Sequence, residues 1–298
     1  MILFQCDYNE GAHPRIMERM METNLEQSPG YGEDAHCRRA AQLICKACGN
    51  DRLAVHFLVG GTQANMTVID AALRSHQGVI SAGSGHINVH ETGAVESLGH
   101  KVLAVPHKDG KLTAAQVEEL YQSHVHDSSF EHMVQPKMVY ISNPTEYGTL
   151  YSRKELEELS RVCREHDLYL FMDGARLGYG LAAPDNELDL PFLAEHCDVF
   201  YIGGTKVGAL FGEAVVIVNE ELKKDFRYFT YILHSAFPDA ICRRLPGQLF
   251  HGLAHCVGRK QEHTTAGVYL HMIAHITQLK ILHGVSLLCF CFVPGLSR

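Results

Sequence analysis

The chain has 298 residues, a length that suits one large α/β domain or two smaller domains. Hydrophobic residues make up 46% and charged residues 20%, so the chain can bury a sizeable core and is neither a disordered nor a fibrous protein. The formal net charge of -8 argues against broad non-specific binding to nucleic acids, which requires basic patches. No apolar run approaches the roughly 20 residues of a membrane-spanning helix, so we expect no membrane partner either.

The N-terminal sequence and the cysteines indicate the compartment. The start, MILFQCDYNEGAH, has neither the basic residues nor the small-residue cleavage site of a secretory signal. Ten cysteines in such a chain indicate free thiols in a reducing compartment, so we expect a cytoplasmic protein. Cys45 and Cys48 have redox or zinc spacing, but no second Cys/His pair stands at a suitable spacing and the stretch is helix-like. Free thiols are therefore expected there too.

From residue 50 onward, short β-branched runs alternate with charged helical runs. Helical spacing at 61–76 follows the first strand, and two later helices begin after the N-cap candidates Thr113 and Ser152. The strands are expected at 54–59, 101–106, 137–142, 168–173, 198–203 and 214–219. Strands that are apolar on both faces and separated by helices predict an α/β fold with a mostly parallel sheet, covered on both sides. In such sheets, ligands bind beyond the carboxyl ends of the strands.

Charge is divided unevenly along the chain. Residues 1–233 hold 32 of the 34 acidic and 20 of the 26 basic residues, a net charge of -12. Residues 234–298 hold two acidic and six basic residues, a net charge of +4, together with seven of the 20 histidines. Four of these have i,i+4 spacing, His251 with His255 and His271 with His275. No nearby carboxylate would orient them, so we expect no metal site.

The first expected strand is followed by Gly60, Gly61 and Thr62 at the start of a helix. The two glycines let the backbone approach an anion, and the helix N-terminus offers free N–H groups, which suits a phosphate. The Lys-Ser/Thr ending of a nucleotide P-loop and the spacing of a dinucleotide fingerprint are missing. Taken alone, the motif would be read as a plain strand-to-helix turn.

Two charged residues follow later strands. Asp173 ends a buried strand, where an acid is costly unless it is paired, and Lys206 follows another strand beside two glycines and a hydroxyl. A partly desolvated lysine can form an imine. The alternatives are a helix cap for Asp173 and a solvated loop charge for Lys206. A phosphate cradle, an acid and a lysine, all at strand ends in this order, together predict a site for pyridoxal 5'-phosphate.

These stretches resemble the low-specificity L-threonine aldolase and β-eliminating lyase family of pyridoxal-phosphate enzymes, which have the aspartate-aminotransferase (type I) fold. The matching stretches are VGGTQAN, GHINVHETGA, FMDGARLGYGL and FYIGGTKVGALFGEAVVI, and the resemblance covers about residues 4–230. It implies a seven-stranded, mostly parallel sheet flanked by helices. It also implies a lyase that cleaves β-hydroxy-α-amino acids, such as L-threonine or L-allo-threonine, to glycine and an aldehyde. β-Elimination and transamination on the same scaffold are the alternatives.

The resemblance assigns roles to the cofactor contacts. Lys206 would bind the cofactor as a Schiff base, and Asp173 would hold the pyridine nitrogen. Gly61 and Thr62, assisted by Thr205, would hold the phosphate. His86 would stack on the ring and relay a proton.

Four further residues are placed near the reacting atoms by the resemblance. Arg176 would lie near a cofactor oxygen and the substrate carboxylate, and Glu91 would support the site from behind. Glu146 stands where threonine aldolases typically have a histidine, so it is either a second candidate base beside His86 or the sign of a different substrate. Cys6 replaces a small polar residue near the substrate carboxylate, which leaves the substrate open.

The resemblance also suggests how the chain is divided. We expect an N-terminal segment over 1–45 that contributes to the active site, a large cofactor domain over 46–230, and an anomalous tail over 231–298. Our hypothesis is that a shifted reading frame or a replaced 3' end removed the family's C-terminal small domain and its substrate-binding arginine. A non-catalytic remnant is then the rival reading. The family implies a small amino-acid substrate and a homo-oligomer, a dimer or a tetramer.

Overall fold

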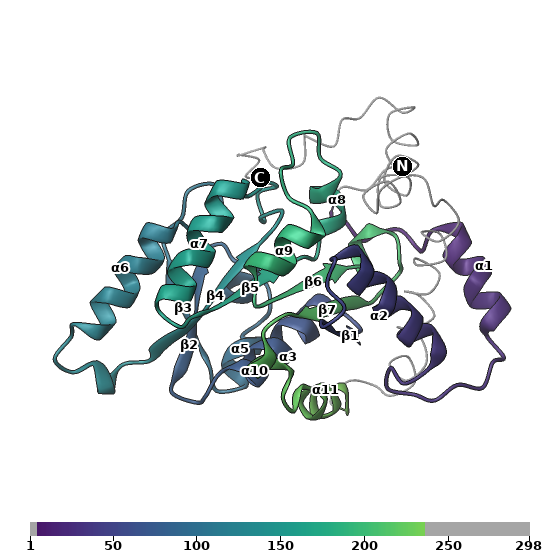
Figure 1. The fold of residues 1–298 in the computed structure, drawn as a ribbon, viewed down its shortest axis with the longest axis horizontal. Coiled ribbons are helices and arrows are strands. Elements are labelled where there is room, and N and C mark those ends of the chain that lie inside the picture. The colour runs from purple at the N-terminus through teal and green to yellow at the C-terminus, as the bar shows by residue number, and fades with distance from the viewer. Residues whose placement is uncertain (1–4, 236–298) are drawn as a thin grey trace, which may run out of the picture.

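The structure, a computed structural model, describes residues 5–235 (Figure 1). The strands are β1 (Ala54–Leu58), β2 (Gln77–Ala82), β3 (Lys101–Val105), β4 (Gln135–Ser142), β5 (Tyr169–Asp173), β6 (Val199–Gly203) and β7 (Glu213–Ile217). The helices are α1 (Pro14–Thr23), α2 (Ala35–Ala47), α3 (Gly61–Ala72), α4 (His86–Val89), α5 (Ala94–Ser97), α6 (Ala114–Val125), α7 (Arg153–Glu165), α8 (Leu177–Leu181), α9 (Leu190–His196), α10 (Glu220–Lys223) and α11 (Phe226–Ser235). Two 3-10 turns, η1 (Phe130–His132) and η2 (Thr205–Val207), complete the described elements.

The seven strands form one sheet in the order β1-β7-β6-β5-β4-β2-β3. All neighbouring pairs are parallel except those of β7, which is antiparallel to both β1 and β6. The six predicted strands are confirmed, whereas β2 was not predicted: it begins with Gln77 and Gly78, and Ser81 interrupts the short apolar run that follows. The reversed direction of β7 follows from its connection to β6, which is too short for the dozen or more residues of a parallel crossover.

Helices cover both faces of this sheet (Figure 1). One buried cluster joins one face of β4–β7 to α2, α6, α7 and α9, and the other joins the opposite face to α3, α5, α10 and α11. Along β4, Val139 and Ile141 belong to the first cluster, while Met138 and Tyr140 belong to the second. This alternation is the expected consequence of strands whose successive side chains point to opposite faces.

Both predicted N-caps are confirmed. Thr113 and Ser152 each accept from the backbone N–H three residues on, while Gln116 and Glu155 bond back to complete a capping box. Because these contacts span only three residues, the local sequence is sufficient to specify where α6 and α7 begin.

The expected free thiols of Cys45 and Cys48 are confirmed as well. Both side chains are free and buried, and burial raises the pKa of Cys48 to about 12. Within residues 5–235, no helix has the length and apolar character required to cross a membrane. The paired histidines at 251, 255, 271 and 275, and the predicted tail from residue 236 on, lie outside the described residues.

Candidate active site

The carboxyl ends of the parallel strands meet along one edge of the sheet, as the fold class predicts. Ser142, Asp173 and Gly203 are the last residues of β4, β5 and β6. Since β7 runs the other way, its first residue, Glu213, lies at the same edge opposite Gly203. A glycine is required at 174, directly after Asp173, because a Cβ there would collide with the carbonyl oxygen of Tyr201.

The Asp173 carboxylate is 4% exposed and receives four hydrogen bonds. Oδ1 accepts from the Tyr201 hydroxyl at 2.5 Å and from the Ala175 N–H at 2.9 Å. Oδ2 accepts from the Tyr140 hydroxyl at 2.5 Å and from the Asn65 amide at 3.2 Å. Four donors match the acceptor capacity of a carboxylate, so the hydrogen-bonding positions of Asp173 are filled within the protein. The sequence alternative of a helix-cap role is wrong, since Arg176 is the N-cap of α8 and makes no side-chain cap bond.

Tyr140 and Tyr201 stay protonated at this site. Burial, and next the negative charge of Asp173, raise the pKa of both hydroxyls well above the usual value of 10. Each hydroxyl therefore keeps its single proton and donates it to Asp173. Because the tyrosines come from β4 and β6, they hold the carboxylate from both neighbours of β5.

A second chain of hydrogen bonds leads from Asp173 to His86. The same Asn65 amide nitrogen that contacts Asp173 donates to Glu91 Oε1 at 2.7 Å. His86 Nδ1 lies 2.8 Å from that Glu91 oxygen. Because a carboxylate only accepts, this contact assigns the proton to Nδ1 and leaves Nε2 of a neutral imidazole with a free lone pair.

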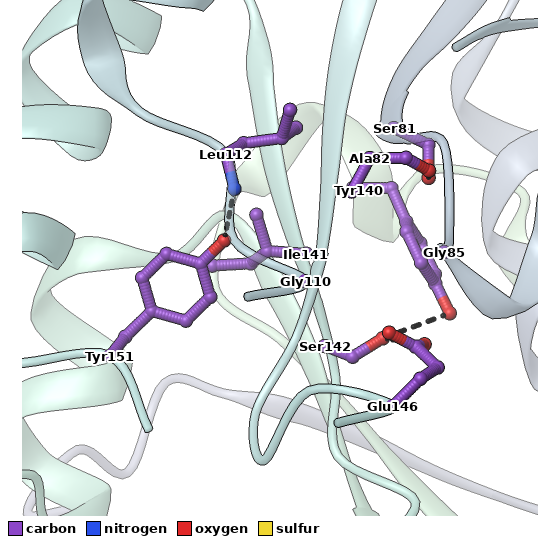
Figure 2. A pocket seen from close by; sticks show the side chains of 10 residues that line it. All are labelled: Ser81, Ala82, Gly85, Gly110, Leu112, Tyr140, Ile141, Ser142, Glu146 and Tyr151. Carbon is purple, nitrogen blue, oxygen red and sulfur yellow. Dashed lines mark hydrogen bonds between the residues drawn. The ribbon is translucent and has the colours of Figure 1, made fainter. Parts of the chain in front are cut away.

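Glu146 lies on the other side of His86. Its Oε1 accepts from the His86 backbone N–H at 3.0 Å and from the Ser142 hydroxyl at 2.7 Å. Burial, and to a smaller degree Asp173, raise the pKa of Glu146 above its usual 4.5. Figure 2 shows Glu146 and Tyr140 lining one pocket at the ends of β2 and β4, together with Gly85. Gly85 directly precedes His86 in the sequence.

Lys206 lies in the η2 turn between β6 and β7. The buried acid Glu213 holds this turn in place. Thr205 donates from its hydroxyl to Glu213 Oε1 at 2.7 Å, and the Gly204 N–H donates to Oε2 at 3.2 Å. Burial raises the pKa of Glu213 to about 8. Among the described residues, none forms an ion pair or side-chain hydrogen bond with Lys206 Nζ, so its amine is available.

The N-terminal segment covers this turn. His13 donates its backbone N–H to the Gly208 oxygen at 2.8 Å, and the Tyr8 ring centroid lies 5.9 Å from Lys206 Nζ. Asp7 pairs with the Arg176 guanidinium through two nitrogens. Burial lowers the pKa of Arg176, but the bond and charge of Asp7, together with the charges of Asp173 and Glu146, raise it overall. The segment therefore supplies an acid and an aromatic ring above the sheet edge.

The N-terminus of α3 fits a phosphate. Its N-cap, Gly60, makes no side-chain cap bond, so the first-turn N–H groups of this 12-residue helix are left for another acceptor. Gly61 lies against Tyr201: a Cβ there would stand 3.1 Å from the tyrosine hydroxyl. Two buried atoms nearby, Asn65 Oδ1 and Glu91 Oε2, have no partner among the described residues. Unpaired buried polar atoms beside an available lysine and an uncapped helix fit a site that a further molecule completes.

The comparisons with known proteins agree with this arrangement. The family model described as Beta-eliminating lyase matches residues 5–281. The chain belongs to the beta-eliminating lyase family. It is 33% identical over 228 residues to the low specificity L-threonine aldolase of Pseudomonas aeruginosa, a match that covers 76% of this chain and 64% of that protein.

Solved structures support the same family and fold. A threonine aldolase structure from Leishmania major superposes with a TM-score of 0.83 at 42% identity, covering 94% of this chain and 77% of that one. An aspartate aminotransferase from Thermus thermophilus has a TM-score of 0.66 at 15% identity, covering 92% of this chain and 69% of that one. At that identity the likeness concerns the fold alone. The chain thus has the aspartate-aminotransferase type of α/β fold, and it spans slightly less than two thirds of the length of the Pseudomonas relative.

In this member of the beta-eliminating lyase family, most sequence-predicted site residues gather at one edge. They are Gly61, His86, Glu146, Asp173, Arg176, Thr205 and Lys206, and Thr62 stands in the first turn of α3. Cys6 donates its thiol to Asn9 Oδ1 at 2.8 Å, within the N-terminal segment.

Five residues with contacts at this edge were not predicted from the sequence: Asp7, Asn65, Tyr140, Tyr201 and Glu213. The available signal was a polar group placed within or beside an apolar run, as in VYIS and FYIG. That signal does not name the partner of each group. Within the described part of the chain, no three His, Cys, Asp or Glu side chains form a group suited to a metal.

Proposed function

We propose that this chain is a pyridoxal-phosphate-dependent lyase that cleaves β-hydroxy-α-amino acids, converting L-threonine or L-allo-threonine to glycine and acetaldehyde. The observation that carries the proposal is the available Lys206 amine at the same sheet edge as the four-donor carboxylate of Asp173. The threonine aldolase names of the Pseudomonas and Leishmania relatives support the substrate class.

The residues at the edge suit the parts of the cofactor. Lys206 would hold it covalently, Asp173 would take the ring nitrogen, and the α3 N-terminus with Gly61, Thr62 and Thr205 would hold the phosphate. His86 would cover the ring face. When bound, the cofactor supplies an electron-accepting ring that stabilises negative charge at the amino-acid Cα.

Two side chains are suited to accept the proton of the substrate β-hydroxyl. In a neutral His86, Nε2 carries the lone pair, because Nδ1 donates its proton to the bond with Glu91. Glu146 has a raised pKa, which brings its proton affinity closer to neutral pH, where a general base is most effective. We propose one of these two as the base, acting directly or through a water.

Arg176 and Cys6 are the proposed groups for the substrate end. The Arg176 guanidinium would contact the substrate carboxylate, for which Asp7 is the resident competitor. Cys6 precedes Asp7 in the chain, and we propose that its weakly polar thiol, which donates to Asn9 Oδ1, contributes to this end of the site.

β-Elimination is the second candidate, favoured by the description of the matching family as Beta-eliminating lyase. Both reactions start from the same bound amino acid and differ in which bond is broken. The two are separated by assay: acetaldehyde from L-threonine reports aldol cleavage, and pyruvate from L-serine reports elimination.

The test begins with the purified full chain and added cofactor. A visible absorbance band of lysine-bound cofactor that is lost in Lys206→Ala supports the binding role, and acetaldehyde from L-threonine or L-allo-threonine supports the activity. Lys224→Ala is the matched control because Lys224 is exposed and, within residues 5–235, pairs with Glu221, beyond the C-terminal end of β7 and away from the edge that holds Lys206. A band without any product would instead support a non-catalytic remnant.

The division of the chain and its assembly are also proposed. We propose the three segments given above. We also propose an altered 3' end for residues 231–298, although the family match extends into this segment, to residue 281. Translation of the other two frames downstream of Phe229 tests it. We further propose a cytoplasmic homo-oligomer, consistent with six free cysteines among the described residues. Light scattering of the purified chain measures the oligomeric state.

A further inference from the structure

We propose that Asn65 is a positioning residue that couples the ring-nitrogen site at Asp173 to the ring-face residue His86, through Glu91. This inference rests on the proposed cofactor. It predicts that an interaction at one end of the chain of hydrogen bonds changes the other end, although Asp173 and His86 share no direct bond.

The first reason is that the acceptor positions of the Asp173 carboxylate are already filled. All four of its acceptor positions are filled, and the contact from Asn65, at 3.2 Å, is the longest. The Ala175 N–H belongs to the backbone and the two tyrosine bonds are 2.5 Å long. A new donor that binds Asp173 would therefore displace the Asn65 hydrogen bond first.

The position of Asn65 is the second reason. Its side chain is fully buried in α3, and one amide nitrogen lies between two carboxylates, 2.7 Å from Glu91 and 3.2 Å from Asp173. The amide cannot turn over without aiming its oxygen at both acids, so the NH2 group is held between them. When it leaves Asp173, it keeps its other acceptor, Glu91 Oε1.

Glu91 connects Asn65 to His86. The same Oε1 atom accepts from Asn65 and lies 2.8 Å from His86 Nδ1, so both contacts share one acceptor. Its second oxygen is buried without a partner among the described residues, so the carboxylate has an unused acceptor position with which to respond. Because coupling between two sites is reciprocal, a change at Glu91 must alter binding at Asp173 by the same factor.

The experiment measures affinity rather than turnover, with two probes and the full chain. One probe is pyridoxal 5'-phosphate; the other is its analogue with a C–H in place of the ring nitrogen, which makes no bond to Asp173. The ratio of their dissociation constants, from absorbance titration, isolates the ring-nitrogen contribution. Glu91→Gln removes the charge that draws Asn65 away from Asp173, so we expect the preference for the nitrogen-containing probe to fall at least about fivefold.

Asn65→Ala separates coupling from direct charge effects. A through-space influence of Glu91 would persist without Asn65, whereas the proposed coupling requires the amide. We expect Glu91→Gln to change the preference less than about twofold in the Asn65→Ala background. Asn65→Ser, too short to bridge the two acids, replaces it if Asn65→Ala does not fold. Equal changes in both backgrounds, or no change in Glu91→Gln alone, would overturn the proposal.

The controls are one variant outside the network and probe binding by the wild-type chain. Tyr151→Phe removes another buried hydroxyl, one that accepts from the Leu112 N–H and not from the Asp173 network, so it should leave the preference unchanged (Figure 2). If the wild-type chain binds neither probe, the proposed function fails. If both probes bind and the effects of the variants are additive, only the coupling by Asn65 fails.

Discussion

Glu213, the first residue of β7, accepts a hydrogen bond from the Thr205 hydroxyl at 2.7 Å and so fixes the turn that carries Lys206. The two residues lie eight positions apart in the chain, at the point where it reverses from β6 into the antiparallel β7. An acid that is 2% exposed therefore supports the proposed cofactor lysine through the residue that precedes it.

This burial predicts a pH dependence of stability. The pKa of Glu213 is raised to about 8 in the folded chain from an ordinary value of 4.5, so its contribution is full below pH 4.5 and is lost as pH rises through about 8. Between these values the wild-type free energy of unfolding should fall relative to that of Glu213→Gln, by up to about 1.4 kcal/mol per pH unit. Urea unfolding at several pH values measures the difference. Exposed Glu119→Gln should follow the wild type, and parallel curves for Glu213→Gln would contradict the prediction.

Glu146→Gln tests the proposed base. If Glu146 accepts the substrate proton, kcat for L-threonine should fall about 10²–10⁴-fold and the acidic limb of the pH–rate profile should disappear. Ser142→Ala removes one donor to Glu146 but keeps the carboxylate, so a loss within about tenfold is expected. An unchanged profile in Glu146→Gln would assign the base to His86.

Asp7→Asn tests the competition for Arg176. Without the Asp7 charge, the half-buried guanidinium is free for an anionic substrate, so KM should fall about two- to fivefold, the range for a partly exposed ion pair. Steady-state kinetics at low salt measure it. Glu10→Gln makes the same charge change in the same segment without contacting Arg176, and should leave KM as it is. A higher KM in Asp7→Asn would mean that Asp7 positions Arg176 rather than competing for it.

Gly174→Ala should destabilise the sheet edge. The added methyl group collides with the carbonyl oxygen of Tyr201, so the backbone must move there, at the residue whose hydroxyl donates to Asp173. We expect a loss of about 2–4 kcal/mol in the free energy of unfolding. Gly11→Ala, with no atom within 4 Å of the new methyl group, should stay within about 0.5 kcal/mol of the wild type. Equal denaturation midpoints for the two variants would contradict this account.

The sequence by itself determined the local elements and the motif residues. Capping boxes at Thr113 and Ser152, the apolar strand runs, and the placement of Asp173 and Lys206 after strands depend on neighbours within a few residues. These interactions repeat wherever the local pattern occurs, so they can be recognised without a structure.

Only the tertiary structure decided the partners of those residues. Asn65 and Asp173 are 108 positions apart, Tyr201 and Asp173 are 28 apart, and Arg176 and Asp7 are 169 apart. Which buried polar groups meet depends on strand order, on the reversal of β7 and on which face each side chain takes. These features arise from the packing of the whole sheet, so they cannot be predicted from any single stretch of sequence.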